Sequence, residues 1–259
     1  MRGSSLAGWA AAFCVALAGA LPLAAPAQDM AAHVAAGRAF DALRSAHPER
    51  LPRLAEPEAA EALRTLADAE AFLPAQSGVD LPTLSDACDR AQAAVVAYQT
   101  FGALQNGQLV ASMVVDNAAT YQDELALLQP FVARCIARQV PLAEATLRQM
   151  DPRTVAQLRL GGLRRGQATI LQLYASLATA LPDARIRPAN IDALLGALAE
   201  TVSVHVRALA VAARAVPRDL ASAQGREGGP RQPKWQRIAA AMADTRCDAL
   251  CDLAARNGR

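Results

Sequence analysis

The 259-residue chain has few of the residues that build β-sheets. Aromatic residues make up only 4% of it, and valine and isoleucine rarely fall in alternating runs. Alanine and leucine are abundant instead, and both lose little free energy on entering a helix, whereas strands select β-branched and aromatic residues. The composition therefore predicts an all-α protein, built as an antiparallel multi-helix bundle.

The chain also lacks an excess of charge of one sign. It contains 26 lysine and arginine residues against 24 aspartate and glutamate residues, which gives a net charge of +2. Lys234 is the only lysine, and we attribute the preference for arginine to compositional bias. So small a net charge produces no field that would attract DNA or an anionic membrane. We therefore expect no nucleic-acid partner.

Sequence motifs of catalysis and cofactor binding are missing. The chain has no zinc-protease signature, no serine nucleophile elbow and no dinucleotide-binding fingerprint. Its three histidines, His33, His47 and His205, are scattered. Asp123 and Glu124 are adjacent and point in different directions on a helix, so they do not form a carboxylate pair for acid–base catalysis. We expect a protein that is not an enzyme, with no cofactor and no metal site.

Long uncharged apolar runs are absent except at the N-terminus. Met1-Arg2 gives a positive start, residues 6–25 are almost wholly apolar, and Ala25-Pro26-Ala27 fits a signal peptidase site before Gln28. Residues 1–27 are therefore predicted to be a signal peptide, cleaved near Ala27. A retained anchor and a lipoprotein modified at Cys14 are the alternatives. The prediction is a periplasmic or secreted protein with no transmembrane segment in its mature chain.

Helical periodicity and chain breakers divide the rest of the sequence. Residues 28–217 are predicted to form the bundle domain, and the glycine- and proline-rich segment 218–234 a flexible linker. Residues 235–259 are predicted to form a tethered C-terminal helix. The expected helices cover approximately residues 29–46, 56–72, 83–104, 108–138, 141–150, 152–181, 189–216 and 235–256.

Four cysteines remain after the signal peptide: Cys88, Cys135, Cys247 and Cys251. An even number in an exported protein predicts two disulfides, for which three pairings exist. If the helices 83–104 and 108–138 turn back on each other near residue 105, Cys88 faces about residue 122 and not Cys135. A Cys88–Cys135 bond therefore requires a kink at Pro130 or a longer hairpin. Cys247 and Cys251 lie one helical turn apart and can bond each other if the helix frays. Alternatively, one or both of them bond to Cys88 or Cys135 and attach the C-terminal helix to the bundle.

Two features of the predicted core have competing interpretations. His205 lies on the apolar face of helix 189–216, where it is either a neutral core histidine or a ligand to a cofactor. Gly161, Gly162 and Gly166 interrupt a helix at a cost of about 1 kcal/mol each relative to alanine. Close approach of a neighbouring helix is the interpretation that we favour for these glycines.

From these observations we expect an exported envelope protein that acts by binding, with another envelope protein as its partner. The expected contact surface surrounds Tyr121 and Phe131 and includes the C-terminal helix at Trp235, which could occupy or leave a groove. The alternative is a carrier that holds a small apolar ligand between helices near His205, Gly162 and Gly166. The oligomeric state stays open.

Overall fold

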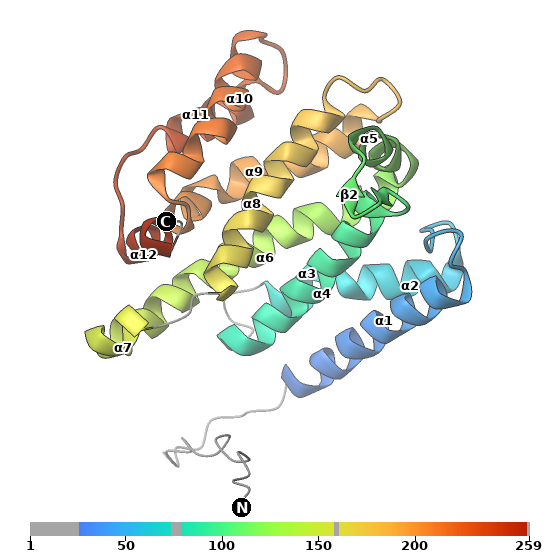
Figure 1. Ribbon diagram of the computed structural model, residues 1–259, viewed down its shortest axis with the longest axis horizontal. Helices are drawn as coiled ribbons and strands as arrows, with labels where there is room; N and C mark the ends of the chain where they lie inside the picture. Colours follow the sequence, from blue (N-terminus) through green and yellow to red (C-terminus); the bar gives the residue numbers. More distant parts are fainter. Residues whose placement is uncertain (1–25, 74–78, 158–160, 258–259) are drawn as a thin grey trace, which may run out of the picture.

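The computed structural model describes residues 26–73, 79–157 and 161–257. The predicted signal peptide lies almost entirely outside the described residues. The rest forms an all-α multi-helix bundle, as the composition predicted (Figure 1). The elements are α1 Pro26–Ala46, α2 Pro57–Leu66, α3 Ala69–Phe72, α4 Leu81–Thr100, β1 Leu104–Gln105, β2 Gln108–Leu109, α5 Ala111–Thr120, α6 Gln122–Gln149, α7 Pro152–Gln157, α8 Gly161–Ala180, α9 Pro188–Ala208, the 3₁₀ helix η2 Val211–Arg214, α10 Ala215–Arg226, α11 Gln232–Met242 and α12 Ala249–Asn257.

The centre of the bundle consists of α4, α6 and α9. Helix α6 packs against both others, and its buried face carries Leu128, Val132 and Cys135. The helix continues through Pro130 and Pro141. Helices α1 and α2 flank this centre on one side, and the pair α10 and α11 flanks it on the opposite side (Figure 1). Within the described residues, no helix is both long enough and apolar enough to span a membrane.

The predicted helix 108–138 is in fact two helices with a hairpin in front of them. Asn106 and Gly107 both have positive φ and form the turn between β1 and β2, which pair in register from Leu104 to Leu109. Helix α5 then ends at Tyr121, whose backbone leaves the helical region for a single residue. The apolar spacing runs on across this break, so periodicity alone did not reveal it.

This connection explains the first disulfide. Because the hairpin and α5 together link α4 to α6, Cys88 lies about as far from the end of α4 as Cys135 lies from the start of α6. The two cysteines therefore meet, with their Cα atoms 5.8 Å apart, and form a disulfide. The longer hairpin is what makes the bond possible. The second disulfide joins Cys247 and Cys251, so neither C-terminal cysteine is bonded to the bundle.

The segment 218–234 is not a flexible linker, which corrects the prediction from its composition. Helix α10 includes residues up to Arg226, and a short turn with positive φ at Gly228 and Gly229 leads into α11. Gly225 lies inside α10, and a Cβ atom at this position would be in van der Waals contact with Trp235 of α11 at 3.6 Å. The predicted helix 235–256 is likewise divided, because residues 243–248 separate α11 from α12.

Candidate functional site

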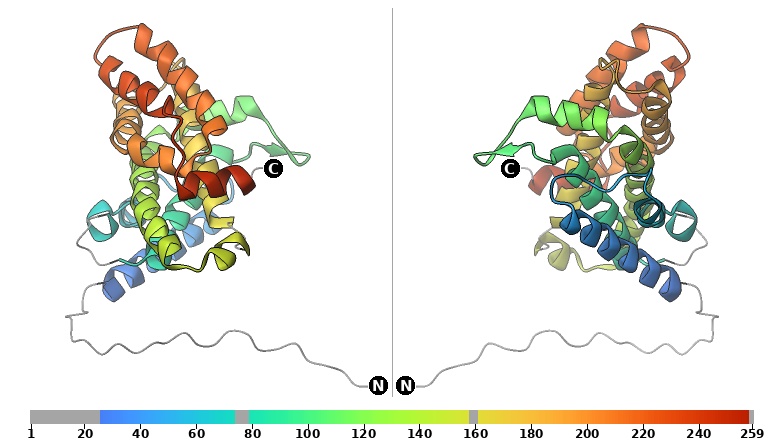
Figure 2. Two further views of the ribbon diagram at one scale, coloured as in Figure 1. Left: turned by 90° about the vertical axis from the view of Figure 1, so that its left-hand side faces the viewer. Right: turned by 90° about the vertical axis from the view of Figure 1, so that its right-hand side faces the viewer.

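The four residues proposed from the sequence as partner or ligand contacts are all buried. Tyr121 and Phe131 lie in the core, and Trp235 is 1% exposed between α11 and its neighbours. His205 is fully buried. In this structure these side chains pack between helices and do not face solvent, so the contact surface expected around them stays a prediction. Exposed leucines lie elsewhere in the described chain, at Leu104 and Leu109 of the hairpin that projects from the bundle (Figure 2).

Tyr121 fixes the loop that connects α1 to α2. The guanidinium of Arg53 lies 5.0 Å from the centre of the Tyr121 ring and donates from Nε to Glu124 Oε1 at 3.1 Å. The same carboxylate oxygen accepts the backbone N–H of Leu54 at 2.8 Å. Glu124 is thus a buried acceptor whose charge Arg53 balances. The contacts of Glu124 with Arg53 and Leu54 attach this loop to the start of α6.

His205 connects α9 to α6. Its Nε2 lies 2.8 Å from the carbonyl oxygen of Ala133, and because a carbonyl only accepts, Nε2 must carry the proton. Nδ1 lies 3.4 Å from the hydroxyl of Thr201. Burial lowers the pKa of His205 to about 4, partly offset by the Ala133 hydrogen bond. This is the neutral core histidine, and both ring nitrogens are directed at protein atoms.

The acidic residues near Tyr121 are engaged in separate contacts. Asp116 accepts from Arg185 at 2.9 Å, and Asp123 accepts from Asn190 at 3.0 Å. Asn117 donates to two backbone carbonyls at the end of α4. No group of three or more potential metal ligands occurs in the part of the chain that the structure describes.

A row of amide side chains bridges α4 and α8. Gln92 donates to Gln172 at 3.0 Å, Gln172 donates to Gln99, and Gln99 donates to Ser176 at 2.6 Å. These hydrogen bonds link α4 to α8 through polar side chains. Space remains on both sides of this glutamine row.

The larger space lies under the N-terminal half of α8 and forms a groove of about 270 Å³. We call it the α8 groove. Its walls come from α4, α6 and α8 and from the ends of α9 and α12, and they are mostly apolar. The residues that define it best are Val132, Ile136, Val140, Leu147, Met150, Leu163 and Leu250. A smaller space of about 210 Å³ lies beyond the glutamine row, under the C-terminal half of α8.

Two of the glycines line this groove, and this corrects their predicted role. A Cβ atom placed on Gly162 or on Gly166 would meet nothing within 4 Å, so no helix approaches them closely. Their effect is to leave a wall of the α8 groove bare. His205 does not line the groove, whereas Ala208 on the next turn of α9 does.

Polar groups gather at the rim of the α8 groove. Arg165 reaches across to Asp89 of α4 at 3.8 Å, and both side chains are mostly exposed. Gln167 donates to the carbonyl of Ala208 at 2.7 Å and ties α8 to the end of α9. An apolar interior with a polar rim suits a ligand whose body is apolar and whose end is polar.

Comparison with known proteins gave no match, since no family model, no curated protein and no solved structure is significantly similar to this chain.

Sequence reasoning found Gly162 and Gly166 but not the rest of the groove. The glutamines of the row come from helices 80 residues apart in the chain, so no local pattern links them. One signal was available: Gln92, Gln99 and Gln172 interrupt otherwise apolar helical faces, and Gln92 and Gln99 have helical spacing.

Proposed function

We propose that the protein is a binding protein of an extracytoplasmic compartment, and that it holds a small, largely apolar molecule in the α8 groove. The observation that carries the proposal is the apolar groove itself, with the bare positions Gly162 and Gly166 in its wall. Glycine in a helix interior is about 1 kcal/mol less favourable than alanine. Close packing of a neighbouring helix does not offset that cost here, because a Cβ atom at either position would meet nothing within 4 Å. The protein acts by binding, without catalysis.

The size of the groove favours a small molecule over a segment of another protein. Ligand sites usually measure roughly 300–1,000 Å³, and the α8 groove lies just below this range at about 270 Å³. A compact apolar body fits such a volume, with a polar end at Arg165 on the rim. An amphipathic helix would require a longer groove with several successive pockets.

A fluorescent apolar probe tests the binding site directly. We expect N-phenyl-1-naphthylamine to gain fluorescence on titration with the full chain, and Gly166→Leu to abolish the gain by filling the groove. Ala168→Leu is the matched control, because Ala168 is exposed on the same helix and does not line the groove. Equal binding by the Gly166→Leu and Ala168→Leu variants would refute a site in the groove.

The extracytoplasmic location rests on the predicted signal peptide, and the two disulfides are compatible with it. Intact-mass measurement of the protein from the periplasm of an expressing bacterium tests this part separately. A mature chain that starts at Gln28 supports export, whereas a chain that retains residues 1–27 contradicts cleavage.

Partner binding is a second candidate, supported by the projecting hairpin. Leu104 and Leu109 are paired across the strands and are 66% and 55% exposed. Directly paired residues project on the same face of a hairpin, so these leucines form one apolar contact suited to an apolar surface of an envelope protein. Photocrosslinking in cells from position 104, with exposed Arg148 as the control position, should give a protein adduct at 104 alone. Identical labelling from both positions would contradict this candidate.

A further inference from the structure

The Cys247–Cys251 disulfide differs in exposure between its two ends. Cys247 lies in the exposed segment that precedes α12, whereas Cys251 is fully buried in the first turn of that helix. Their Cα atoms are 5.2 Å apart. A reagent from solution therefore has access to Cys247, and the sulfur of Cys251 faces the protein interior.

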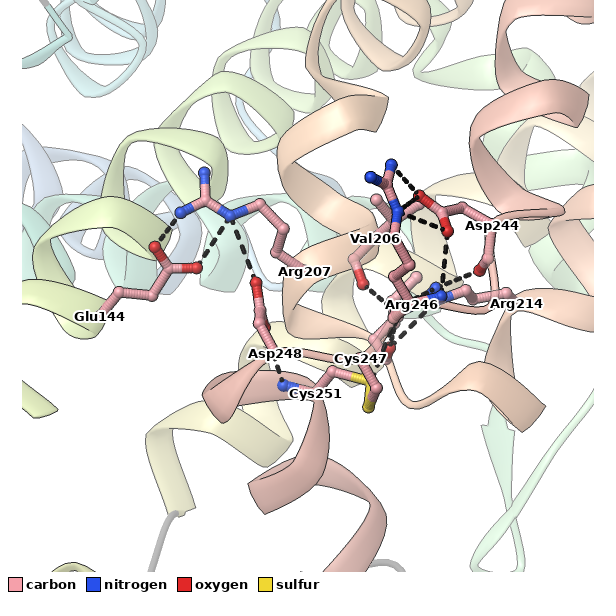
Figure 3. A network of polar contacts seen from close by, with 10 residues as sticks. Glu144, Val206, Arg207, Arg214, Asp244, Arg246, Cys247, Asp248 and Cys251 are labelled. Atoms are coloured by element: carbon pink, nitrogen blue, oxygen red, sulfur yellow. Dashed lines mark hydrogen bonds and ion pairs between the residues drawn. A yellow bond between two sulfur atoms is a disulfide. The ribbon is translucent and has the colours of Figure 1, made fainter. Parts of the chain in front are cut away.

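Arg214 lies against the buried sulfur. Arg214 of η2 is 2% exposed as a residue, and Nη2 of its guanidinium lies 3.3 Å from Cys251 Sγ (Figure 3). Its other contacts are backbone carbonyls: Nη2 donates to Val206 at 2.7 Å, Nε donates to Leu209 at 3.1 Å, and Nη1 donates to Asp244 and Arg246. Carbonyl oxygens satisfy the donors of the guanidinium but do not cancel its charge.

The carboxylates near Arg214 are paired with other arginines. Asp244 binds Arg246 at 2.7 Å, and Asp248 lies 3.6 Å from Nε of Arg207, which also binds Glu144 (Figure 3). Within the described residues, no carboxylate oxygen lies within 4 Å of the Arg214 guanidinium. Burial lowers the pKa of Arg214, and the charges of Asp244 and Asp248 partly oppose this. Arginine nevertheless stays protonated in proteins, so a buried positive charge lies beside Cys251.

We propose that Cys247–Cys251 is a thiol–disulfide exchange site that accepts two electrons from a dithiol. A positive charge stabilises a thiolate, and Arg214 places one beside Cys251. The N–H of Cys251 at the start of α12 already donates to Asp248 Oδ1 at 3.4 Å, so the stabilisation comes from Arg214 and not from the end of the helix. Reduction therefore supplies Arg214 with the negative partner that the oxidised protein lacks. Arg214 is a positioning residue here, since it acts through the leaving sulfur.

The exchange consists of two displacements. A thiolate of the dithiol attacks Sγ of Cys247, a bond forms between these sulfurs, the Cys247–Cys251 bond breaks, and its electron pair leaves on Sγ of Cys251. The second thiol of the dithiol then loses its proton and attacks the dithiol's own sulfur in the mixed disulfide, releasing Cys247 as a thiolate that takes up a proton. The dithiol is oxidised to a disulfide, and its other proton passes to solvent while Cys251 stays a thiolate.

The surroundings determine which sulfur leaves. A disulfide breaks faster when the departing sulfur is the better-stabilised thiolate. Nη2 of Arg214 lies 3.3 Å from Sγ of Cys251, whereas Cys247 is open to water in a segment that carries Asp244 and Arg246. Asp248, which follows Cys247, also accepts the backbone N–H of Cys251, so Arg214 is the charge that distinguishes the two sulfurs. Attack at the accessible Cys247 therefore expels the sulfur that the protein stabilises.

Two single-thiol variants of the full chain test this directly. Cys247→Ser leaves Cys251 as a free thiol, and Cys251→Ser leaves Cys247; the Cys88–Cys135 bond is intact in both. We expect thiolate absorbance at 240 nm to appear in Cys247→Ser at a pH at least about one unit below the ordinary thiol midpoint of about 8.5. The free Cys247 thiol of the Cys251→Ser variant should deprotonate at a higher pH than the free Cys251 thiol of the Cys247→Ser variant. Coincident titrations, or the reverse order, would overturn the proposal.

The rate of reduction by dithiothreitol, a simple dithiol, tests the role of Arg214. We expect Arg214→Gln to slow reduction of Cys247–Cys251 on the order of tenfold, and Arg214→Lys to restore much of the rate because it keeps the charge. Equal rates in folded Arg214→Gln and Arg214→Lys would contradict the role of charge. If Arg214→Gln does not fold, the comparison of the two single-thiol variants still decides the proposal.

Discussion

The two disulfides of this protein lie in different surroundings and close loops of very different size. Cys88–Cys135 joins α4 to α6 in the buried centre and spans 47 residues of the chain. Cys247–Cys251 lies at the edge of the fold, spans 4 residues and has one exposed end. The first disulfide therefore holds two core helices together, whereas the second is accessible to solvent at Cys247.

Loop size predicts how much each bond stabilises the fold. Closing a loop removes conformational entropy from the unfolded chain, and the chain-entropy argument gives about 4 kcal/mol for the central bond and about 2 kcal/mol for the C-terminal one. A short exposed bond therefore contributes less to folding and is freer to take part in exchange. The α8 groove borders both regions, since Cys88 and Leu250 line it.

The largest expected effect comes from removing the central disulfide. We expect Cys88→Ala together with Cys135→Ala to lower the free energy of unfolding by about 4 kcal/mol. Cys247→Ala together with Cys251→Ala should lower it by about 2 kcal/mol or less. Urea denaturation at pH 7 measures both. A C-terminal pair that costs more than the central pair would reverse the comparison.

The buried centre should also be sensitive to acid through His205. Its folded pKa of about 4 lies below the unfolded value of 6.5, so the unfolded chain binds a proton that the folded chain excludes. The contribution of neutral His205 to stability is fully present above pH 6.5 and is lost as the pH falls toward 4. The free energy of unfolding should decrease by about 2 kcal/mol between pH 7 and pH 5. Urea denaturation at these two pH values measures the loss.

His205→Gln is the control for this acid effect. Glutamine keeps a side-chain donor for the Ala133 carbonyl but does not titrate, so the variant should lose less stability between pH 7 and pH 5. Burial also lowers the pKa of His33, so stability falls with decreasing pH through this residue too, both in the original protein and in the His205→Gln variant. An unchanged pH dependence in His205→Gln would show that His205 is not the source.

The smallest expected effect concerns the groove between the two regions. Gly166→Ala should raise the free energy of unfolding by about 0.5–1 kcal/mol, because alanine favours the helix and its Cβ has room. Thermal or urea denaturation measures the gain, and Ala168→Gly on the exposed side of α8 should produce a loss of similar size. Destabilisation by Gly166→Ala would mean that a helix does pack closely at this position.

The sequence predicts where most helices form, but it says little about how the helices pack against one another. Composition and spacing gave the all-α class and most helices, because these depend on neighbours in the chain. The break at Tyr121 was missed because apolar spacing continues across it, and α10 was missed because the nearby Gly228, Gly229 and Pro230 dominated the composition.

The sites depend on contacts that the sequence order does not contain. Arg214 and Cys251 are 37 residues apart and meet only because η2 and α12 both pack at the end of α9. Asp244, Asp248 and Asp252 are close to the C-terminal cysteines in the sequence, and such negative charges disfavour a thiolate. The buried arginine that favours one comes from a distant segment, so the sequence does not reveal it. A contact surface around Tyr121, Phe131 and Trp235 stays a prediction, because aromatic side chains serve equally well in cores and in interfaces and the sequence does not distinguish the two.

Selective reduction of the native full chain tests the central comparison most directly. The protein is treated with dithiothreitol under native conditions, free thiols are blocked with iodoacetamide after unfolding, and the labelled peptides are identified by mass spectrometry. We expect label on Cys247 and Cys251 while Cys88 and Cys135 stay bonded to each other. Simultaneous labelling of all four cysteines, or earlier labelling of Cys88 and Cys135, would contradict it.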